Sequence, residues 1–151
     1  MKLKLIIASV AIIFGMVSAA HAQIKPKPGP ASGTQVKASA AYSEVLLHRA
    51  ELTAELESLL VEYTEDYPKV KALRTELGFL GKEIDRLFAV PPAEVGKLST
   101  ALGKLMIRKV QSQTELWNLQ QTYKDDHPDV KTAQKKIEVF ESAIKEILGP
   151  S

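Results

Sequence analysis

The chain repeats itself with a period of 60 residues, and this repeat constrains its fold more than any other feature. Aligned without gaps, residues 44–88 and 104–148 share nine identical positions, eight of them between Glu55 and Lys71. The first copy of that stretch reads ELESLLVEYTEDYPKVK and the second reads ELWNLQQTYKDDHPDVK. Similarity at a fixed spacing is typical of a duplicated supersecondary unit.

The apolar residues that follow the proline of each copy keep the same spacing of 3-4-3-4-3. They are Val70, Leu73, Leu77, Leu80, Ile84 and Leu87 in the first copy, and Val130, Ala133, Ile137, Phe140, Ile144 and Ile147 in the second. The segments before the prolines carry similar stripes, and Lys109 and Ser112 interrupt the stripe of the second copy. Two apolar positions in every seven predict helices that pack as in a coiled coil. No segment alternates as a strand does, so we expect an all-α fold.

Prolines mark the predicted helix boundaries. Pro68 and Pro128 suit the first turn of a helix, where the missing N–H has no intrahelical partner. Asp66 and Asp126, two residues earlier, are expected near the helix caps. The predicted helices are 42–63, 68–88, 92–123 and 128–148, and the short connections between them predict antiparallel neighbours. The hairpins of this duplicated antiparallel coiled coil are residues 41–90 and 91–151.

The N-terminal segment indicates export. Lys2 and Lys4 precede an apolar run, Leu5 to Ala20, that is shorter than the roughly 20 residues a membrane-spanning helix needs. The triplet Ala20-His21-Ala22 fits the small-x-small pattern that signal peptidase recognises. We therefore expect residues 1–22 to be a signal peptide cleaved after Ala22, a periplasmic or secreted location, and no integral membrane segment after cleavage.

Residues 23–40 have the composition of a disordered linker, because alternate prolines exclude helix and favour extended chain. Their three lysines suit either a plain spacer or a basic tether. Without the signal peptide the chain has 18 basic and 18 acidic residues, and residues 41–151 carry 15 basic and 18 acidic ones. A near-neutral helical body argues against nucleic acid as a partner.

The turn motif Tyr-x-x-Asp-(Tyr/His)-Pro-x-Val-Lys is the one local signature, and it occurs twice. The candidate residues for interaction or turn formation are Tyr63, Asp66 and Pro68 in the first copy, and Tyr123, Asp126, His127 and Pro128 in the second. A docking tip is one interpretation. The other is a helix-turn-helix corner in which the tyrosine packs under the turn and the aspartate caps the next helix, and this accounts for every shared residue.

The sequence gives little indication of a catalytic or metal-binding site. The chain has no cysteine, no Gly-rich phosphate loop, and no serine or cysteine placed for activation by His48. Asp125, Asp126, His127 and Asp129 resemble a metal cluster, but the corresponding residues of the first copy, Glu65 to Lys69, do not. Acidic residues are also common at helix starts. We therefore expect a protein that is not an enzyme, with no catalytic, metal or cofactor site.

Trp117 lies off the main stripe, on a line with Met106 and Val110. Its counterpart in the first copy is Glu57, which must tolerate water. One interpretation is that Met106, Val110 and Trp117 remain partly exposed in the monomer and become buried against a partner. The alternative is that the third helix packs deeper into a bundle.

The two turns, within 55–71 and 115–131, resemble the periplasmic coiled-coil part of polysaccharide co-polymerases, the chain-length-determinant family. In that family a similar Tyr…His-Pro-x-Val turn leads into a Leu/Ile heptad helix. The present chain departs from the pattern in its duplicated hairpin and in lacking a C-terminal membrane segment and a kinase domain. The resemblance implies a helical hairpin facing the cell envelope.

Together these features predict a non-enzymatic interaction or scaffold protein of the cell envelope. Its partner is expected to be a protein, or a second copy bound through the helical stripes. An envelope chaperone that clasps unfolded clients between helical arms is one alternative, although its usual strongly basic surface is missing. A metal- or ligand-responsive helical protein is the other, and it depends on residues 125–129 alone.

We expect the mature N-terminus to be Gln23. The intact mass of the protein purified from its native envelope measures this directly. Ala22→Leu removes the small residue that the peptidase requires, and this variant should keep residues 1–22. If the unaltered protein still carried residues 1–22, the expectation of a soluble exported protein would be wrong. The protein would instead be anchored in the membrane by that segment.

Overall fold

The structure, a computed structural model, describes residues 33–149, and every regular element in that range is helical. The elements are α1 (Gly33–Lys37), α2 (Ala40–Leu60), α3 (Pro68–Phe88), the 3-10 helix η1 (Pro92–Lys97), α4 (Thr100–Gln120) and α5 (Pro128–Leu148). The predicted all-α class is therefore confirmed for these residues. The predicted signal peptide and residues 23–32 of the predicted linker lie outside the described range.

The four long helices have matching bounds. Each spans 21 residues, and the bounds of α4 and α5 are those of α2 and α3 displaced by 60. Pro68 and Pro128 are the first residues of α3 and α5, so the predicted helix starts are confirmed. The fixed φ of proline favours this position, and the N–H that proline lacks would have no partner there.

Two sequence-predicted boundaries are wrong, one because of a helix cap and one because of a buried side chain. The third helix was predicted to begin at residue 92, but 92–97 form η1 and α4 begins only after Ser99, whose Oγ accepts from Leu102 N at 3.3 Å. Ser39 caps α2 in the same way, accepting from Tyr42 N at 3.2 Å. Residues 33–37, predicted as linker, form α1, because Val36 is completely buried against the core.

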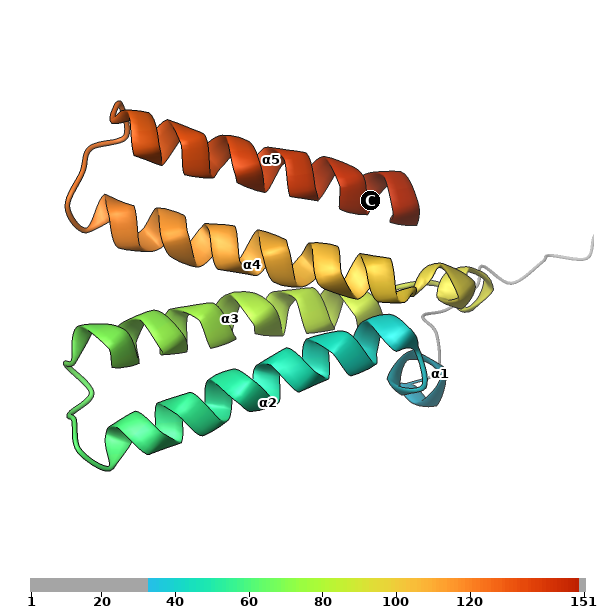
Figure 1. The fold of residues 1–151 in the computed structure, drawn as a ribbon. Coiled ribbons are helices and arrows are strands. Elements are labelled where there is room, and N and C mark those ends of the chain that lie inside the picture. Colours follow the sequence, from blue (N-terminus) through green and yellow to red (C-terminus); the bar gives the residue numbers. More distant parts are fainter. Residues whose placement is uncertain (1–32, 150–151) are drawn as a thin grey trace, which may run out of the picture.

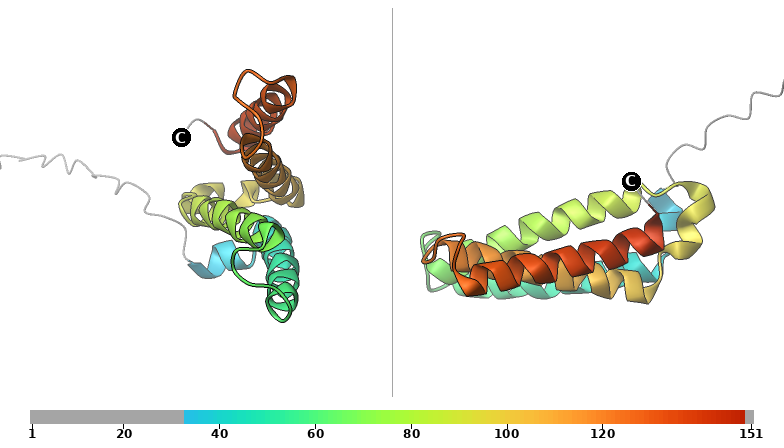
Figure 2. Two further views of the ribbon diagram at one scale, coloured as in Figure 1. Left: turned by 90° about the vertical axis from the view of Figure 1, so that its left-hand side faces the viewer. Right: turned by 90° about the horizontal axis from the view of Figure 1, so that it is seen from above.

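The two hairpins, α2–α3 (hairpin 1) and α4–α5 (hairpin 2), lie side by side with both turns at the same end of the molecule (Figure 1). Helix α4 is the central element, since it packs on α2, α3 and α5, whereas α5 packs chiefly on α4 (Figure 2). The main core accordingly joins α2, α3 and α4, and includes Ile144 from α5. Helices α2 and α5 are left as the outer helices.

A close approach at the end opposite the turns fixes α4 on hairpin 1. A Cβ atom added to Gly103 would lie 2.9 Å from Ala41 O and 2.9 Å from Glu44 Cβ, which is closer than real Cβ atoms come. Ala41 N–H also donates to Leu98 O at 3.1 Å, which ties the start of α2 to the segment before α4. Only glycine permits this spacing between the two helix backbones.

No helix among residues 33–149 is both long enough and apolar enough to cross a membrane.

We expect Gly103→Ala to lower the free energy of unfolding by about 1–3 kcal/mol, because the new methyl group meets backbone atoms rather than a flexible side chain. Gly78→Ala is the matched control. Gly78 is exposed within α3 and has open space around it, so alanine should stabilise the helix by about 0.5–1 kcal/mol. Urea denaturation measures both changes, and an equal gain in the two variants would refute the close crossing.

Candidate binding groove and hairpin tips

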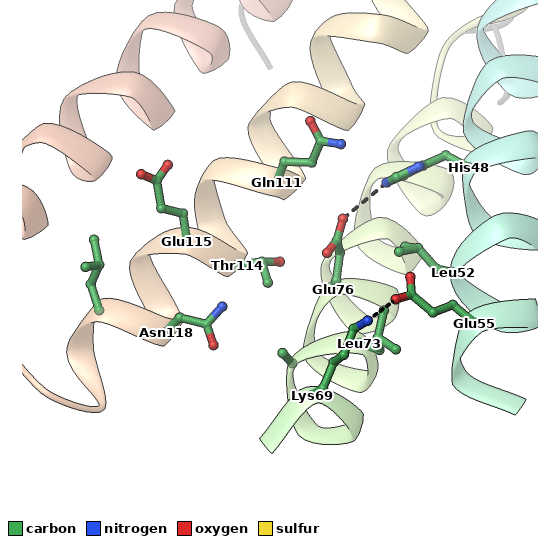
Figure 3. Close-up of a pocket in the computed structure, with 12 residues that line it drawn as sticks. His48, Leu52, Glu55, Lys69, Leu73, Glu76, Gln111, Thr114, Glu115 and Asn118 are labelled. Carbon is green, nitrogen blue, oxygen red and sulfur yellow. Dashed lines mark hydrogen bonds and ion pairs between the residues drawn. The ribbon is translucent and has the colours of Figure 1, made fainter. Parts of the chain in front are cut away.

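A groove of about 620 Å³ lies between hairpin 1 and α4 (Figure 3). Leu52 of α2 and Leu73 of α3, both almost fully buried, form its apolar floor, and the half-buried Leu119 of α4 borders it. The hairpins meet closely at Gly103 and separate towards their turns (Figure 1). The groove therefore opens in the half of the molecule nearer the turns.

The wall formed by hairpin 1 carries polar and charged side chains that pair with each other. His48 Nε2 lies 3.1 Å from Glu76 Oε1, and Lys69 Nζ lies 2.6 Å from Glu55 Oε1, so each pair joins α2 to α3 (Figure 3). The hydrogen bond to Glu55 raises the pKa of the exposed Lys69. This wall presents little unpaired charge to an incoming group.

The opposite wall, formed by α4, has a different character. Thr114 is buried and donates its hydroxyl proton to Val110 O at 3.2 Å. Gln111 and Asn118 are exposed, and their side-chain amides make no hydrogen bond within residues 33–149. Each amide offers a donor and an acceptor to whatever enters the groove.

Each hairpin tip holds a stacked aromatic pair. The rings of Tyr63 and Tyr67 lie 4.1 Å apart with an interplanar angle of 15°. Those of Tyr123 and His127 lie 4.0 Å apart at 23°. Tyr63 and Tyr123 are both 42% exposed. The aromatic residues of the turn motif thus pack on each other across the turn and leave one ring face accessible.

The prediction that Asp66 and Asp126 cap α3 and α5 is wrong. The cap positions of α3 and α5 are Tyr67 and His127, and His127 Nδ1 accepts from Asp129 N at 3.2 Å. Asp66 instead pairs with Lys71 at 2.9 Å, and the hydrogen bond from Lys71 lowers the pKa of its carboxyl. Asp126 is exposed and makes no hydrogen bond in this range. Because proline occupies the first helical position, the cap is the residue directly before it.

The acidic residues around His127 do not converge on one point. Asp125 Oδ1 accepts from Gln120 Nε2 at 3.0 Å, while the His127 ring stacks on Tyr123 and caps α5. No group of three or more His, Cys, Asp or Glu side chains among residues 33–149 is arranged to hold a metal ion. This geometry gives the metal-responsive alternative no support.

The stripe predicted to be partly exposed is largely core. Met106 and Val110 are completely buried, and only Trp117 is half-buried. The prediction assumed that α2 and α4 share one environment because their sequences correspond. In the structure α4 lies between α2, α3 and α5, whereas the corresponding residues of α2, Leu46 and Ala50, are exposed.

A partly buried charge cluster, which the sequence did not predict, joins three helices. Lys109 Nζ of α4 lies 2.6 Å from Glu83 Oε1 of α3 and 2.8 Å from Glu141 Oε2 of α5. Arg86 Nη1 lies 3.0 Å from the same Glu141 oxygen and 3.9 Å from Glu83 Oε2. Glu83 is only 4% exposed. The one signal in the sequence was Lys109 itself, which interrupts an apolar stripe.

The hydrogen bonds of this cluster outweigh burial in setting its charge states. Burial alone would lower the pKa of Lys109 and raise that of Glu141. The hydrogen bonds that Lys109 donates to Glu141 and Glu83 raise its pKa, and those that Glu141 accepts from Lys109 and Arg86 lower its pKa. Lys109 and Glu141 therefore stay charged at neutral pH.

Comparison of this chain with protein-family models, with curated protein sequences and with solved structures yields no match. The class that the fold itself defines is an all-α protein of long antiparallel helices.

We expect the free energy of unfolding to fall as the pH drops below about 4.5. The folded pKa of Glu141 lies below its ordinary value of 4.5, so its contribution is complete above that pH and is lost on acidification. The pKa of Lys109 is raised in the folded protein, so its contribution to stability is complete below about pH 10.5 and is lost only as the pH rises above that value.

Glu141→Gln should flatten the acid limb of the stability profile, which chemical denaturation at a series of pH values measures. Glu138→Gln is the control, because its partner Lys135 is exposed and exposed pairs contribute little. Identical acid limbs in the unaltered protein and Glu141→Gln would show that the cluster does not govern acid stability.

Proposed function

We propose that this chain is a non-enzymatic interaction protein of the cell envelope, built from two repeated coiled-coil hairpins and exported by its N-terminal signal peptide. The apolar run followed by Ala20-His21-Ala22 supports export. The helix bounds displaced by 60 residues support the duplication. The likeness of both turns to the periplasmic hairpin of polysaccharide co-polymerases supports the envelope as the site of action.

The groove between hairpin 1 and α4 is the observation that carries this proposal. Its volume of about 620 Å³ falls within the range of protein ligand sites. Its apolar floor suits the side chains of a protein segment, and the free amides of Gln111 and Asn118 suit that segment's backbone. The ligand we propose is therefore a short peptide segment of another envelope protein, which places apolar side chains over Leu52 and Leu73.

The surroundings of the histidines support a role without catalysis. His48 pairs with Glu76, and His127 accepts from the backbone of Asp129. No hydrogen bond within residues 33–149 joins either ring to a serine, threonine or tyrosine hydroxyl. A histidine base without a neighbouring nucleophile is not an arrangement for covalent catalysis.

A chaperone that holds unfolded clients is the second candidate. The groove between hairpin 1 and α4 lies in the half of the molecule nearer the turns, and a client could enter it from that end. The two candidates differ in selectivity. A scaffold binds one partner in its folded state, whereas a holding chaperone binds many clients only while they are unfolded.

Photo-crosslinking from the groove tests the proposal. A photoreactive amino acid at position 111 or 118 should crosslink to one envelope protein in intact cells, as identified by mass spectrometry. Position 82 on α3 is exposed and outside the groove, so it serves as the control and should not crosslink to that protein. Capture of many unrelated proteins from positions 111 and 118 would favour the chaperone, and equal capture from position 82 would refute the groove.

A surface variant provides the quantitative check. Asn118→Arg places a bulky charged side chain at an exposed position of the groove wall, so the fold should be retained while crosslinking from position 111 drops about tenfold or more. Lys82→Glu, remote from the groove, should leave the yield unchanged.

A further inference from the structure

The surface by which α4 packs on hairpin 1 has an exposed counterpart on α2. Leu102, Met106 and Val110 of α4 are completely buried in the core shared with α2 and α3. The residues 60 positions earlier are Tyr42, Leu46 and Ala50. Leu46 is 44% exposed and Ala50 is exposed. Leu46 and Ala50, which correspond to core-facing residues of α4, thus face outward, while Tyr42 is half-buried and packs against Phe88.

Four exposed apolar residues define this α2 outer face. They are Leu46, Leu47, Ala50 and Ala54, and Leu47 is 60% exposed. The opposite side of the same helix is buried, with Val45 and Leu52 in the core. A helix that is apolar on two sides is typical of one covered on both sides.

The complementary surface recurs on hairpin 2. On hairpin 1, the groove that faces α4 is lined by His48, Leu52, Glu55 and Glu76. Their counterparts 60 residues later are Arg108, Ser112, Glu115 and Lys136. Together with Gln111 and Phe140, these four side chains line a second groove, of about 280 Å³, between α4 and α5. We call it the α4–α5 seat. Helix α5 is the outermost element here (Figure 1), and the described residues place no further helix on the seat.

We propose that a second copy of this chain places its α2 outer face in the α4–α5 seat, and so repeats between molecules the packing of α4 on hairpin 1 within one molecule. The new interface continues an interface that the fold already contains, which identifies the occupant as the same chain. The inference rests on the proposed scaffold function and deepens it. The α4–α5 seat adjoins the groove between the hairpins and shares Gln111 and Glu115 with it, whereas Asn118 lines that groove and not the seat.

Charges at corresponding positions support this pairing. Within one molecule Lys109 of α4 pairs with Glu83 of α3. Arg86 of α3 lies next to Lys109, because both cations contact the same Glu141 oxygen. In the proposed interface Arg49 takes the place of Lys109, while Ala143 and Glu146 take the places of Glu83 and Arg86. Arg49 and Glu146 are exposed, and their side chains make no ion pair or hydrogen bond within residues 33–149. Assembly would bring this unpaired cation and unpaired anion together.

The net charges of the two surfaces are also opposite. Helix α2 carries four glutamates and one arginine. The α4–α5 seat contains Arg108 and Lys136 against Glu115, and the exposed Lys104 and Lys135 lie beside it. An acidic helix and a basic seat favour encounter in the correct orientation.

One position makes the new interface looser than the internal one. The counterpart of Gly103 is Ser43, whose Cβ atom prevents the close crossing that glycine permits. The two helices must therefore lie further apart at that end, which weakens the contact. We expect reversible assembly that depends on protein concentration.

The geometry is head-to-tail, because two different surfaces meet. A heterologous contact of this kind leaves one free face at each end, so assembly proceeds beyond a dimer to an open chain or a ring. A symmetric dimer through two α2 outer faces would instead stop at two copies.

Analytical ultracentrifugation of the purified protein across a concentration series tests the inference. The unaltered protein should associate beyond a dimer as its concentration rises. Leu46→Glu, Arg49→Glu and Glu146→Arg should each weaken association about tenfold or more, because each disrupts one of the two surfaces. Lys82→Glu is a control with the same change in charge as Arg49→Glu, and it should assemble normally.

Charge exchange gives the specific readout. The double variant Arg49→Glu/Glu146→Arg, and an equimolar mixture of the two single variants, should both recover assembly, because each contact then joins opposite charges. A protein that stays monomeric up to about 1 mM would overturn the inference, because its dissociation constant would be too high for specific self-association. So would a dimer that Leu46→Glu abolishes and Glu146→Arg leaves intact, since it would be the symmetric α2 pair.

The two proposals can fail separately. An assembling protein whose groove positions 111 and 118 capture no other protein would reject the proposed groove function alone. A monomeric protein that still crosslinks to one partner from those positions would reject head-to-tail assembly alone.

Discussion

The crossing of α4 over α2 at Gly103 is the constraint on which the rest of the structure depends. Without a side chain at this position, the backbones approach until an added Cβ would lie 2.9 Å from Ala41 O. The close contact holds the two hairpins together at the end opposite the turns and leaves them apart near the turns (Figure 1). The groove over Leu52 and Leu73 is a direct result. Helix α4 lies centrally and contacts all three other long helices.

The charge cluster fixes how α5 and α3 lie against α4. Lys109 reaches Glu83 on one side and Glu141 on the other, so a single ammonium joins three helices. Taking these groups out of water is costly, and the loss of one partner would leave a buried charge uncompensated. Such a cluster contributes little to the net free energy of folding. Its main effect is to favour one packing of the helices over other packings. A rotated α5 would take Glu141 away from Lys109 and Arg86.

The two hairpins, which we propose to be copies of one unit, differ in which of their surfaces are covered. In hairpin 2 the first helix is interior, and Met106 and Val110 are sealed in the core. In hairpin 1 the first helix is exterior, and Leu46 and Ala50 face solvent. A duplicated unit that packs on its own copy leaves a used and an unused version of each surface. The unused α2 outer face and the α4–α5 seat are the surfaces we assign to self-assembly, while the groove between the hairpins is left for another protein.

The sequence by itself determined the helical class and where α3 and α5 begin. The apolar spacing of 3-4-3-4-3 and the prolines at 68 and 128 act locally, through helix periodicity and a fixed φ, and need no knowledge of distant contacts. The capping serines at 39 and 99 are local too, but many serines occur in the chain and only the packing of α1 and η1 selects these two. Burial was decided by tertiary structure alone. Corresponding residues such as Ala50 and Val110 differ in exposure because helices equivalent in sequence are not equivalent in space: one is at the edge, and one is between its neighbours.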